Sequence, residues 1–206
     1  MLALWLMVGG WFGWKPPVGE KLYRVVEVYD GDSFRLENNQ HIRLATVDAP
    51  ENNRCGYMEA KKSLEELILD KEVKIEGNIN ANGRLLATVY LGDQVVNVEQ
   101  ARRGWARHQS QKSSKRAEIQ AAGNEAKKEK RGVYGLCVEK VNSRQPPCSI
   151  KGNNRDVDNG GKDKIYSFKG CGSYNNTEVD LDLGDEWFCT AGQAEAAGYV
   201  RAANCH

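Results

Sequence analysis

Apolar and polar residues alternate along three short runs near the beginning of the chain. The runs are Tyr23–Val28, Ser33–Leu36 and His41–Val47. Alternation with a period of two is typical of half-buried antiparallel strands. Glu72–Glu76 and Leu85–Leu91 continue the pattern, so the first part of the chain is predicted to contain five strands.

Helical spacing replaces this alternation in three later segments, where apolar residues recur every three or four positions. The segments are Met58–Leu69, Val96–Gly104 and Ser114–Arg131. Five strands with helices packed on them form the partly open barrel of the OB architecture. We therefore predict a fold that is mainly β with packed helices (α+β).

The composition changes at Cys148, after which the chain is rich in Gly and Asn. A polar segment without periodicity comes before it and ends in a pair of prolines, which is typical of a linker. Beyond it we expect two strands and one short helix, a small α+β module, at Lys164–Phe168, near Glu186–Cys189 and at Ala191–Ala197. The predicted units are a barrel domain, a linker and a small cysteine-containing accessory module, over residues 21–139, 140–147 and 148–206.

The first fourteen residues carry no charge. They are too few to span a membrane comfortably, but they suit the apolar region of a signal peptide. We predict that residues 1–20 are a signal peptide or, alternatively, an N-terminal membrane anchor that attaches the protein through residues 1–14. Either interpretation places the protein outside the cytosol: secreted, periplasmic or on the outer face of the membrane.

Composition supports a folded chain, since 40% of the 206 residues are hydrophobic and disordered chains contain fewer. The formal net charge is only +1, but residues 102–131 hold ten Lys or Arg against three Glu. This segment is either a surface that faces a polyanion or a solvated helix with pairs at i and i+4. The sequence leaves both interpretations open.

Six cysteines are dispersed along the chain without a C-x-x-C motif, so the usual spacing of a zinc ribbon is absent. An even number of cysteines behind an apolar N-terminus favours disulfides in an oxidising compartment. The alternative is that all six are reduced, as a cytosolic location would require.

Candidate chemistry is concentrated between residues 29 and 51. Asp32 ends an Asp-Gly-Asp turn between the first two strands, and the third strand carries Arg43 and ends close to Asp48 and Glu51. Carboxylates suit a hard cation such as Ca²⁺. A further carboxylate could position or deprotonate water, and an arginine could bind a phosphate. Together these groups indicate phosphodiester hydrolysis.

These motifs, together with Asn82–Tyr90 (NGRLLATVY), resemble those of the staphylococcal nuclease (thermonuclease) family. The resemblance covers about residues 21–139. It implies an OB-fold, monomeric, Ca²⁺-dependent endonuclease that cleaves DNA and RNA with little sequence specificity and leaves 3′-phosphate ends. Because no base-reading element is visible, single-stranded or breathing duplex substrates are expected, and no protein partner is implied.

The resemblance also assigns roles to individual residues. Metal ligands would be the carboxylates of Asp32 and Asp48 and the backbone carbonyl of Ala49. Asp30 would support the metal through water or orient Asp32. The expected catalytic residues are two phosphate-binding arginines and one water-positioning carboxylate: Arg43, Arg84 and Glu51.

Two departures from the family pattern concern substrate binding. Asn82 stands where relatives have a tyrosine, and Arg107–Lys112 lacks the tyrosines that stack on the nucleotide. Base stacking contributes about 1–3 kcal/mol per base, so we expect weaker binding or a different base preference.

Disulfide pairs are also implied by resemblance. Cysteines near positions 55 and 137 occur in secreted relatives, which implies the pair Cys55–Cys137. The tail distantly resembles the Ada-type zinc module, but Phe168 and Ala202 stand where its other thiolates would be, so that the zinc site is degraded. This interpretation implies the pairs Cys171–Cys205 and Cys148–Cys189. Asp156, Asp158, Asp180 and Asp182 are interpreted as a hydrated acidic loop rather than a cation site.

Two rival functions remain open. One is a non-catalytic nucleic-acid-binding OB-fold protein of the cell envelope, because a fold does not fix a function. The other is an envelope protein whose C-terminal module governs attachment to a surface or a partner.

Overall fold

A computed structural model describes residues 21–79, 85–111, 113–157 and 161–205 of the chain. Its larger part is a six-stranded sheet in the order β3-β2-β1-β5-β6-β7, which a parallel pairing of β3 with β6 closes into a five-stranded barrel. This confirms the predicted OB-type α+β fold. The strands are β1 (Leu22–Val28), β2 (Ser33–Leu36), β3 (His41–Leu44), β5 (Glu72–Ile79), β6 (Leu85–Leu91) and β7 (Gln94–Val95).

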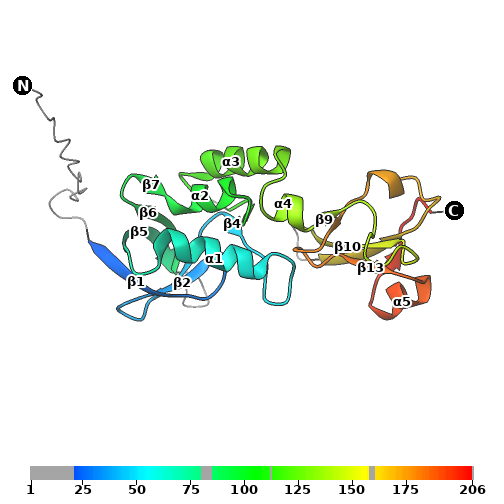
Figure 1. The fold of residues 1–206 in the computed structure, drawn as a ribbon, viewed down its shortest axis with the longest axis horizontal. Coiled ribbons are helices and arrows are strands. Elements are labelled where there is room, and N and C mark those ends of the chain that lie inside the picture. The colour runs from blue at the N-terminus through cyan, green and yellow to red at the C-terminus, as the bar shows by residue number, and fades with distance from the viewer. Residues whose placement is uncertain (1–20, 80–84, 112, 158–160, 206) are drawn as a thin grey trace, which may run out of the picture.

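Helices pack on the barrel through their apolar faces (Figure 1). Leu64 of the first helix and Ile119 of the third are completely buried, as are Phe34 and Val89 of the barrel strands. Burying a large apolar side chain contributes about 1.5–3 kcal/mol, so this shared core holds helices and barrel together. The helices are α1 (Tyr57–Ile68), α2 (Val96–Arg102), α3 (Arg116–Lys128) and the short α4 (Val133–Leu136).

The third strand is shorter than predicted: β3 ends at Leu44, not at Val47. Thr46 adopts a left-handed backbone conformation with φ of 68°, which interrupts the strand. The turn is held because the Thr46 amide donates to Gln111 Oε1 at 2.9 Å and its carbonyl accepts from the Gln109 amide at 2.8 Å. The chain then forms a separate two-stranded ladder from β4 (Val47–Asp48) and β8 (Arg107–His108).

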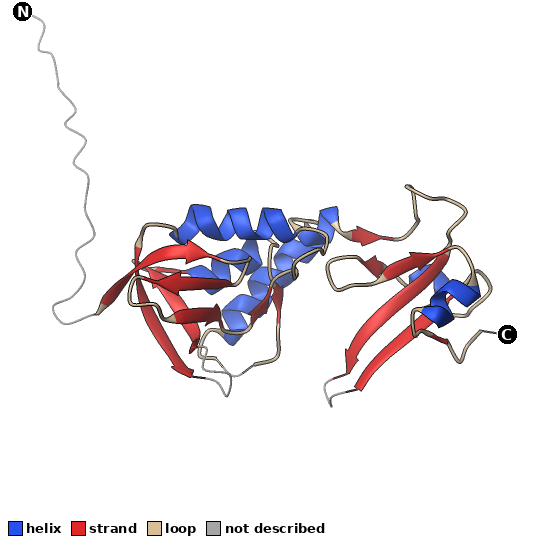
Figure 2. Ribbon diagram, turned by 90° about the horizontal axis from the view of Figure 1, so that it is seen from below, coloured by secondary structure: helices blue, strands red, loops and turns tan. Residues whose placement is uncertain are grey.

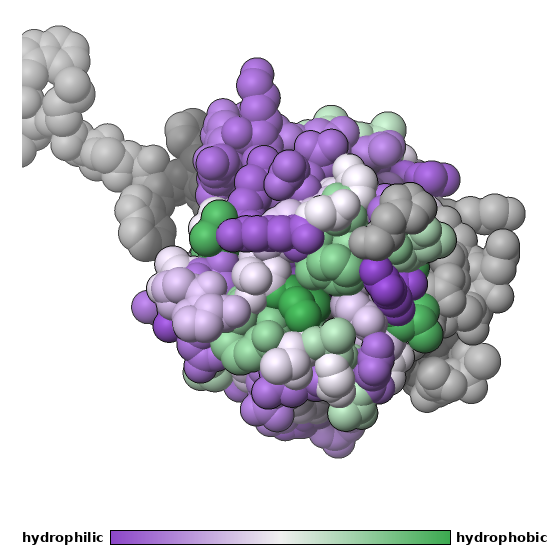
Figure 3. Space-filling view, turned by 90° about the vertical axis from the view of Figure 1, so that its right-hand side faces the viewer, coloured by the Kyte–Doolittle hydropathy of each residue, from purple (hydrophilic) through white to green (hydrophobic). Residues whose placement is uncertain are grey.

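A second, smaller sheet forms the C-terminal part, in the order β13-β10-β11-β14. Tyr166, Phe188, Ala194 and Tyr199 form a hydrophobic core separate from that of the barrel. Figure 3 shows this end of the molecule, with apolar residues gathered in the middle of the face and hydrophilic residues around them. The elements are β10 (Ile150–Val157), β11 (Gly161–Ser167), η1 (Tyr174–Asn176), β13 (Glu186–Phe188), α5 (Ala191–Ala196) and β14 (Val200–Arg201).

Strand β10 was missed from the sequence because its polar KGNNRD stretch has no apolar alternation. It is nevertheless an inner strand of the sheet, paired with both β11 and β13. Gly152 of β10 lies directly beneath the rings of Phe188 and Tyr199, and a Cβ there would come within 2.5 Å of Phe188. Packing against neighbouring strands therefore builds this strand.

The two parts are joined by a two-stranded ladder as well as by the chain (Figures 1 and 2). β9 (Val138–Glu139) pairs antiparallel with β12 (Val179–Asp180). The predicted linker that follows β9 contains a buried side chain: Asn142 donates to the Cys148 carbonyl at 3.0 Å and accepts from the Gln145 amide. Part of the linker is thus folded onto the start of the C-terminal module.

All six cysteines lie among the described residues, and all are paired. The bonds are Cys55–Cys137, Cys148–Cys189 and Cys171–Cys205, the same three pairs as expected from the sequence. The predicted signal peptide or anchor, residues 1–20, lies outside the described residues. Within the described ranges, no helix has both the length and the apolar character needed to cross a bilayer.

Candidate active site

One arginine links the two predicted carboxylate ligands at the edge of the barrel. Arg43 of β3 places Nη1 2.8 Å from Asp32 Oδ1, and its Nη2 donates a short hydrogen bond to Asp48 Oδ1. Arg43 lies opposite Ser33 in the β2–β3 register, so the strand pairing brings the Asp-Gly-Asp turn and the arginine together. The structure therefore assembles Asp32, Arg43 and Asp48 into one cluster.

Asp32 is the buried member of this cluster, with 1% of its surface exposed. Burial raises the pKa of Asp32 from 3.8 to about 7, although the charge of Arg43 lowers it. The nearby Asp30 carboxylate raises that pKa further. Since desolvation disfavours the charged form, a bound cation in addition to Arg43 would favour the ionised state of Asp32.

Local hydrogen bonds fix the orientation of Asp32. Its Oδ1 accepts from the Ser33 hydroxyl at 2.6 Å and its Oδ2 from the Ala49 amide at 2.9 Å. Asp30 Oδ1 accepts from the Asp32 amide at 2.9 Å. The carboxylate is therefore held between the turn before β2 and the segment after β4.

Two buried amide side chains of α2, three residues apart, anchor the turns that carry the site. Gln100 Nε2 donates to the Gly31 carbonyl at 2.7 Å, and Asn97 Nδ2 donates to the Ala45 carbonyl at 2.9 Å. Both side chains are completely buried. The sequence interpretation missed them; their signal is a pair of polar residues at helical spacing on an otherwise apolar face.

The other residues expected at the site lie in different surroundings from Asp32, Arg43 and Asp48. Glu51 is exposed in the loop that follows β4, and its carbonyl accepts from the Arg54 amide at 3.0 Å. Ala49 is buried and contacts Asp32 through its amide. Arg84 and Asn82 lie outside the described residues, so their predicted roles stay predictions.

The donor set suits a hard cation in its chemistry, because Asp32, Asp48 and the Ala49 carbonyl offer only oxygen atoms. Across the described ranges, however, no three or more His, Cys, Asp or Glu side chains are grouped so as to hold a metal. A cation here would take its other ligands from backbone and water.

A pocket of about 300 Å³ lies on the barrel beside β5 and β6. One of its lining residues, Leu86, is the partner of Arg43 in the β3–β6 register. The lining combines hydroxyl and small apolar groups with one carboxylate: Ala45, Glu76, Gly77, Leu86, Thr88, Ser113 and Ser114. This pocket therefore offers hydrogen bonds rather than aromatic stacking.

Five of the nine cations that the structure describes in segment 102–131 form ion pairs. Four of them pair with glutamates that are close in the sequence: Arg102, Arg103, Lys115 and Arg131. The fifth, Arg107, is bound by Asp180 and Asp182 of the C-terminal module. Fewer of these cations are available to a polyanion than the charge count indicates. Because Asp180 and Asp182 bind Arg107, their interpretation as a hydrated loop is wrong.

Arg107 was not predicted to have a role of its own. Burial alone would lower its pKa, but the hydrogen bonds and charge of Asp182, with those of Asp180, outweigh burial and raise it. No sequence signal identifies this arginine, since its partners lie more than 70 residues away along the chain.

Part of the chain resembles known proteins in sequence. Residues 41–135 match the model of the family described as staphylococcal nuclease homologue. An uncharacterized endonuclease of Haemophilus influenzae is 34% identical over 106 residues, covering 49% of this chain and 60% of the relative. The thermonuclease of Staphylococcus hyicus is 26% identical over 129 residues, covering 56% of this chain and 76% of the relative.

The micrococcal nuclease of Shigella flexneri is 34% identical over 70 residues, which cover 32% of this chain and 40% of the relative. The chain thus spans less than two thirds of the length of the Haemophilus and Shigella relatives. The matched segment contains Arg43, Asp48 and Glu51. Residues 41–135 therefore resemble the family described as staphylococcal nuclease homologue.

Proposed function

We propose that this protein is a Ca²⁺-dependent endonuclease that hydrolyses phosphodiester bonds of DNA and RNA with little sequence specificity. The observation that carries the proposal is the cluster of Asp32, Arg43 and Asp48, with Asp32 buried, in a barrel whose sequence resembles staphylococcal nuclease homologues. Single-stranded or breathing duplex substrates, 3′-phosphate products and a monomeric, exported protein belong to the same proposal.

Each residue of the site has a chemical task in this proposal. Asp32, Asp48 and the Ala49 carbonyl would hold the cation, which when bound supplies positive charge against the phosphate. Arg43 donates hydrogen bonds to the phosphate oxygens, whose negative charge increases in the transition state. Glu51 orients or deprotonates the attacking water. Arg84 stabilises the departing 5′-oxygen.

The relation between Arg43 and the carboxylates has a direct consequence. Without substrate, the guanidinium neutralises Asp32 and Asp48. A cation that compensates these carboxylates would leave the donors of Arg43 available to a phosphate, because a guanidinium fork matches a phosphate as well as a carboxylate. Cation and phosphate binding should therefore be cooperative.

The test is cleavage of heat-denatured DNA by the full chain with Ca²⁺ and with chelator. Arg43→Ala and Glu51→Ala should each lower the rate by about 10²-fold or more. Arg35→Ala is a matched control, because Arg35 lies on β2 and pairs with Glu27 away from the site. Glu59→Ala, an exposed position on α1, is the control for Glu51.

The rival proposal, a non-catalytic nucleic-acid-binding protein of the envelope, predicts a different outcome. Folded protein would bind the denatured DNA and leave it intact with or without Ca²⁺. That result would overturn the nuclease proposal and the assignment of the site.

A further inference from the structure

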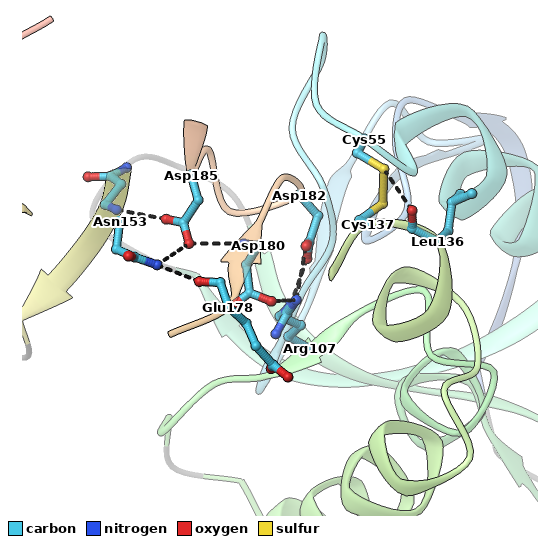
Figure 4. Close-up of polar contacts among 10 residues, drawn as sticks. Cys55, Arg107, Leu136, Cys137, Asn153, Glu178, Asp180, Asp182 and Asp185 are labelled. Carbon is cyan, nitrogen blue, oxygen red and sulfur yellow. Dashed lines mark hydrogen bonds and ion pairs between the residues drawn. A yellow bond between two sulfur atoms is a disulfide. The ribbon is translucent and has the colours of Figure 1, made fainter. Parts of the chain in front are cut away.

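An ion pair that is shielded from solvent connects the C-terminal module to the barrel (Figure 4). Arg107 Nε donates to Asp182 Oδ2 at 2.6 Å, and its Nη2 donates to Asp182 Oδ1 at 2.9 Å and to Asp180 Oδ1 at 2.8 Å. The side chains of Arg107 and Asp182 are only 16% and 2% exposed. Such shielded, bidentate contacts are much stronger than surface ion pairs.

The acidic segment is itself held firmly. Asp180 pairs with Val138 across the β9–β12 ladder, and the Leu181 amide donates to the Cys137 carbonyl at 3.0 Å. Asp185 Oδ2 accepts from the Asp180 amide at 2.9 Å. The two carboxylates are therefore presented to Arg107 by a fixed backbone.

Arg107 in turn lies opposite a predicted metal ligand. In the antiparallel β4–β8 ladder, Arg107 is the partner of Asp48, and His108 is the partner of Val47. Each strand has only two residues, and an isolated ladder of this length is unstable. Contacts that hold β8 therefore also hold the backbone of Asp48.

A second contact reaches the loop that carries Glu51. Gly184 has a φ of +86°, and a Cβ built on it would lie 2.5 Å from Arg54 Cζ. The positive φ favours glycine at this position, and the end of the Arg54 side chain lies against it. The Arg54 amide donates to the Glu51 carbonyl, so the module also borders the turn that begins at Glu51.

We propose that Asp182 is a positioning residue for the candidate site: by holding Arg107 it fixes β8, and through β8 the strand that carries Asp48. The C-terminal module is then part of the frame of the site rather than a separate attachment unit. This inference rests on the proposed function for its catalytic consequence, but not for its structural one.

Hydrogen exchange of the full chain tests the structural part. In Asp182→Ala, exchange at the amides of residues 46–48 and 107–109 should become at least about tenfold faster. Arg107→Lys, which keeps the charge but loses the bidentate contact, should show a smaller increase at the same amides. The control is Glu178→Gln, which removes a charge four residues away whose partner is Lys140 at 3.5 Å.

Cleavage and cation binding test the functional part. Loss of a group that orients a metal ligand typically costs about 10- to 100-fold in affinity or activity. Asp182→Ala should therefore weaken Ca²⁺ binding, which calorimetry measures. It should also lower kcat more than it raises KM. A role in stability alone would lower the midpoint of urea unfolding and leave kcat of the folded protein unchanged.

The possible outcomes separate the two proposals. If wild-type protein cleaves nothing, the proposed function fails, while exchange and Ca²⁺ binding still decide the role of Asp182. If Asp182→Ala does not fold, Arg107→Lys decides it. Unchanged exchange at residues 46–48 and 107–109 in a folded variant would overturn the positioning role, as would faster exchange confined to the module.

Discussion

Gln100 donates a hydrogen bond from Nε2 to the Gly31 carbonyl at 2.7 Å, which ties the middle of α2 to the turn that precedes Asp32. The same nitrogen lies 3.3 Å from the Ala60 carbonyl, and the Ser63 hydroxyl donates to Gln100 Oε1 at 2.7 Å. One buried amide thus connects two helices with the Asp-Gly-Asp turn.

Replacing Gln100 by Leu should destabilise the protein and disturb the site together. The change leaves buried partners without hydrogen bonds, and each unsatisfied group costs about 1–3 kcal/mol. We expect the free energy of unfolding in urea to fall by about 2 kcal/mol or more, with a loss of cleavage activity in the protein that remains folded.

Gln120→Leu is the control for this change, because Gln120 is exposed on α3. Its effect should lie within about 0.5 kcal/mol of wild type. Equal stability of the Gln100 and Gln120 variants would show that the amide network does not hold the turn.

Asp32→Asn should stabilise the cation-free protein at neutral and alkaline pH. Burial raises the pKa of Asp32 from 3.8 to about 7, so above pH 7 the folded state bears the cost of a buried charge that the unfolded state does not. Below pH 3.8 both states are protonated and the cost is absent. The expected gain is on the order of 4 kcal/mol at pH 8, and it shrinks as pH falls through 7 towards 4.

Urea unfolding in chelator at pH 8 and pH 5 measures this difference. Asp48→Asn serves as the control, since 32% of the Asp48 side chain is exposed and its burial penalty is therefore smaller. A variant Asp32→Asn that is less stable than wild type at pH 8 would mean that Arg43 compensates Asp32 fully. The same variant should not cleave DNA, which would separate stability from function at this residue.

The cluster of Asp32, Arg43 and Asp48 could be predicted because turn chemistry and strand alternation are local properties. The end of β3 could not, since the left-handed conformation of Thr46 depends on Gln109 and Gln111, far along the chain. A β-branched residue rarely takes positive φ, so local preference indicated a continuous strand.

Contacts between distant segments account for the other differences. Asp180 and Asp182 carry no local sign of a partner, and only the β9–β12 ladder brings them to Arg107. The disulfide pairs could be named only through family resemblance, because six cysteines allow fifteen connectivities. Resemblance therefore supplied what spacing and periodicity lack: information on tertiary neighbours.

The bond between Cys55 and Cys137 should stabilise the barrel and the loop after Glu51. The cysteines are 82 residues apart, and cross-linking a loop of that size contributes about 4–5 kcal/mol by the chain-entropy model. It also joins the turn that contains Arg54 to the end of α4. The double variant Cys55→Ser/Cys137→Ser should lower barrel stability by up to about that amount and reduce cleavage.

Cys171→Ser/Cys205→Ser is the matched control, since this bond lies in the C-terminal module and closes a separation of 34 residues. Hydrogen exchange distinguishes the two: the first variant should expose amides of the barrel, and the second only those of the module. The prediction fails if both variants change barrel amides equally. Because the module also holds Arg107 through Asp182, such a result would instead show that barrel and module unfold as one cooperative unit.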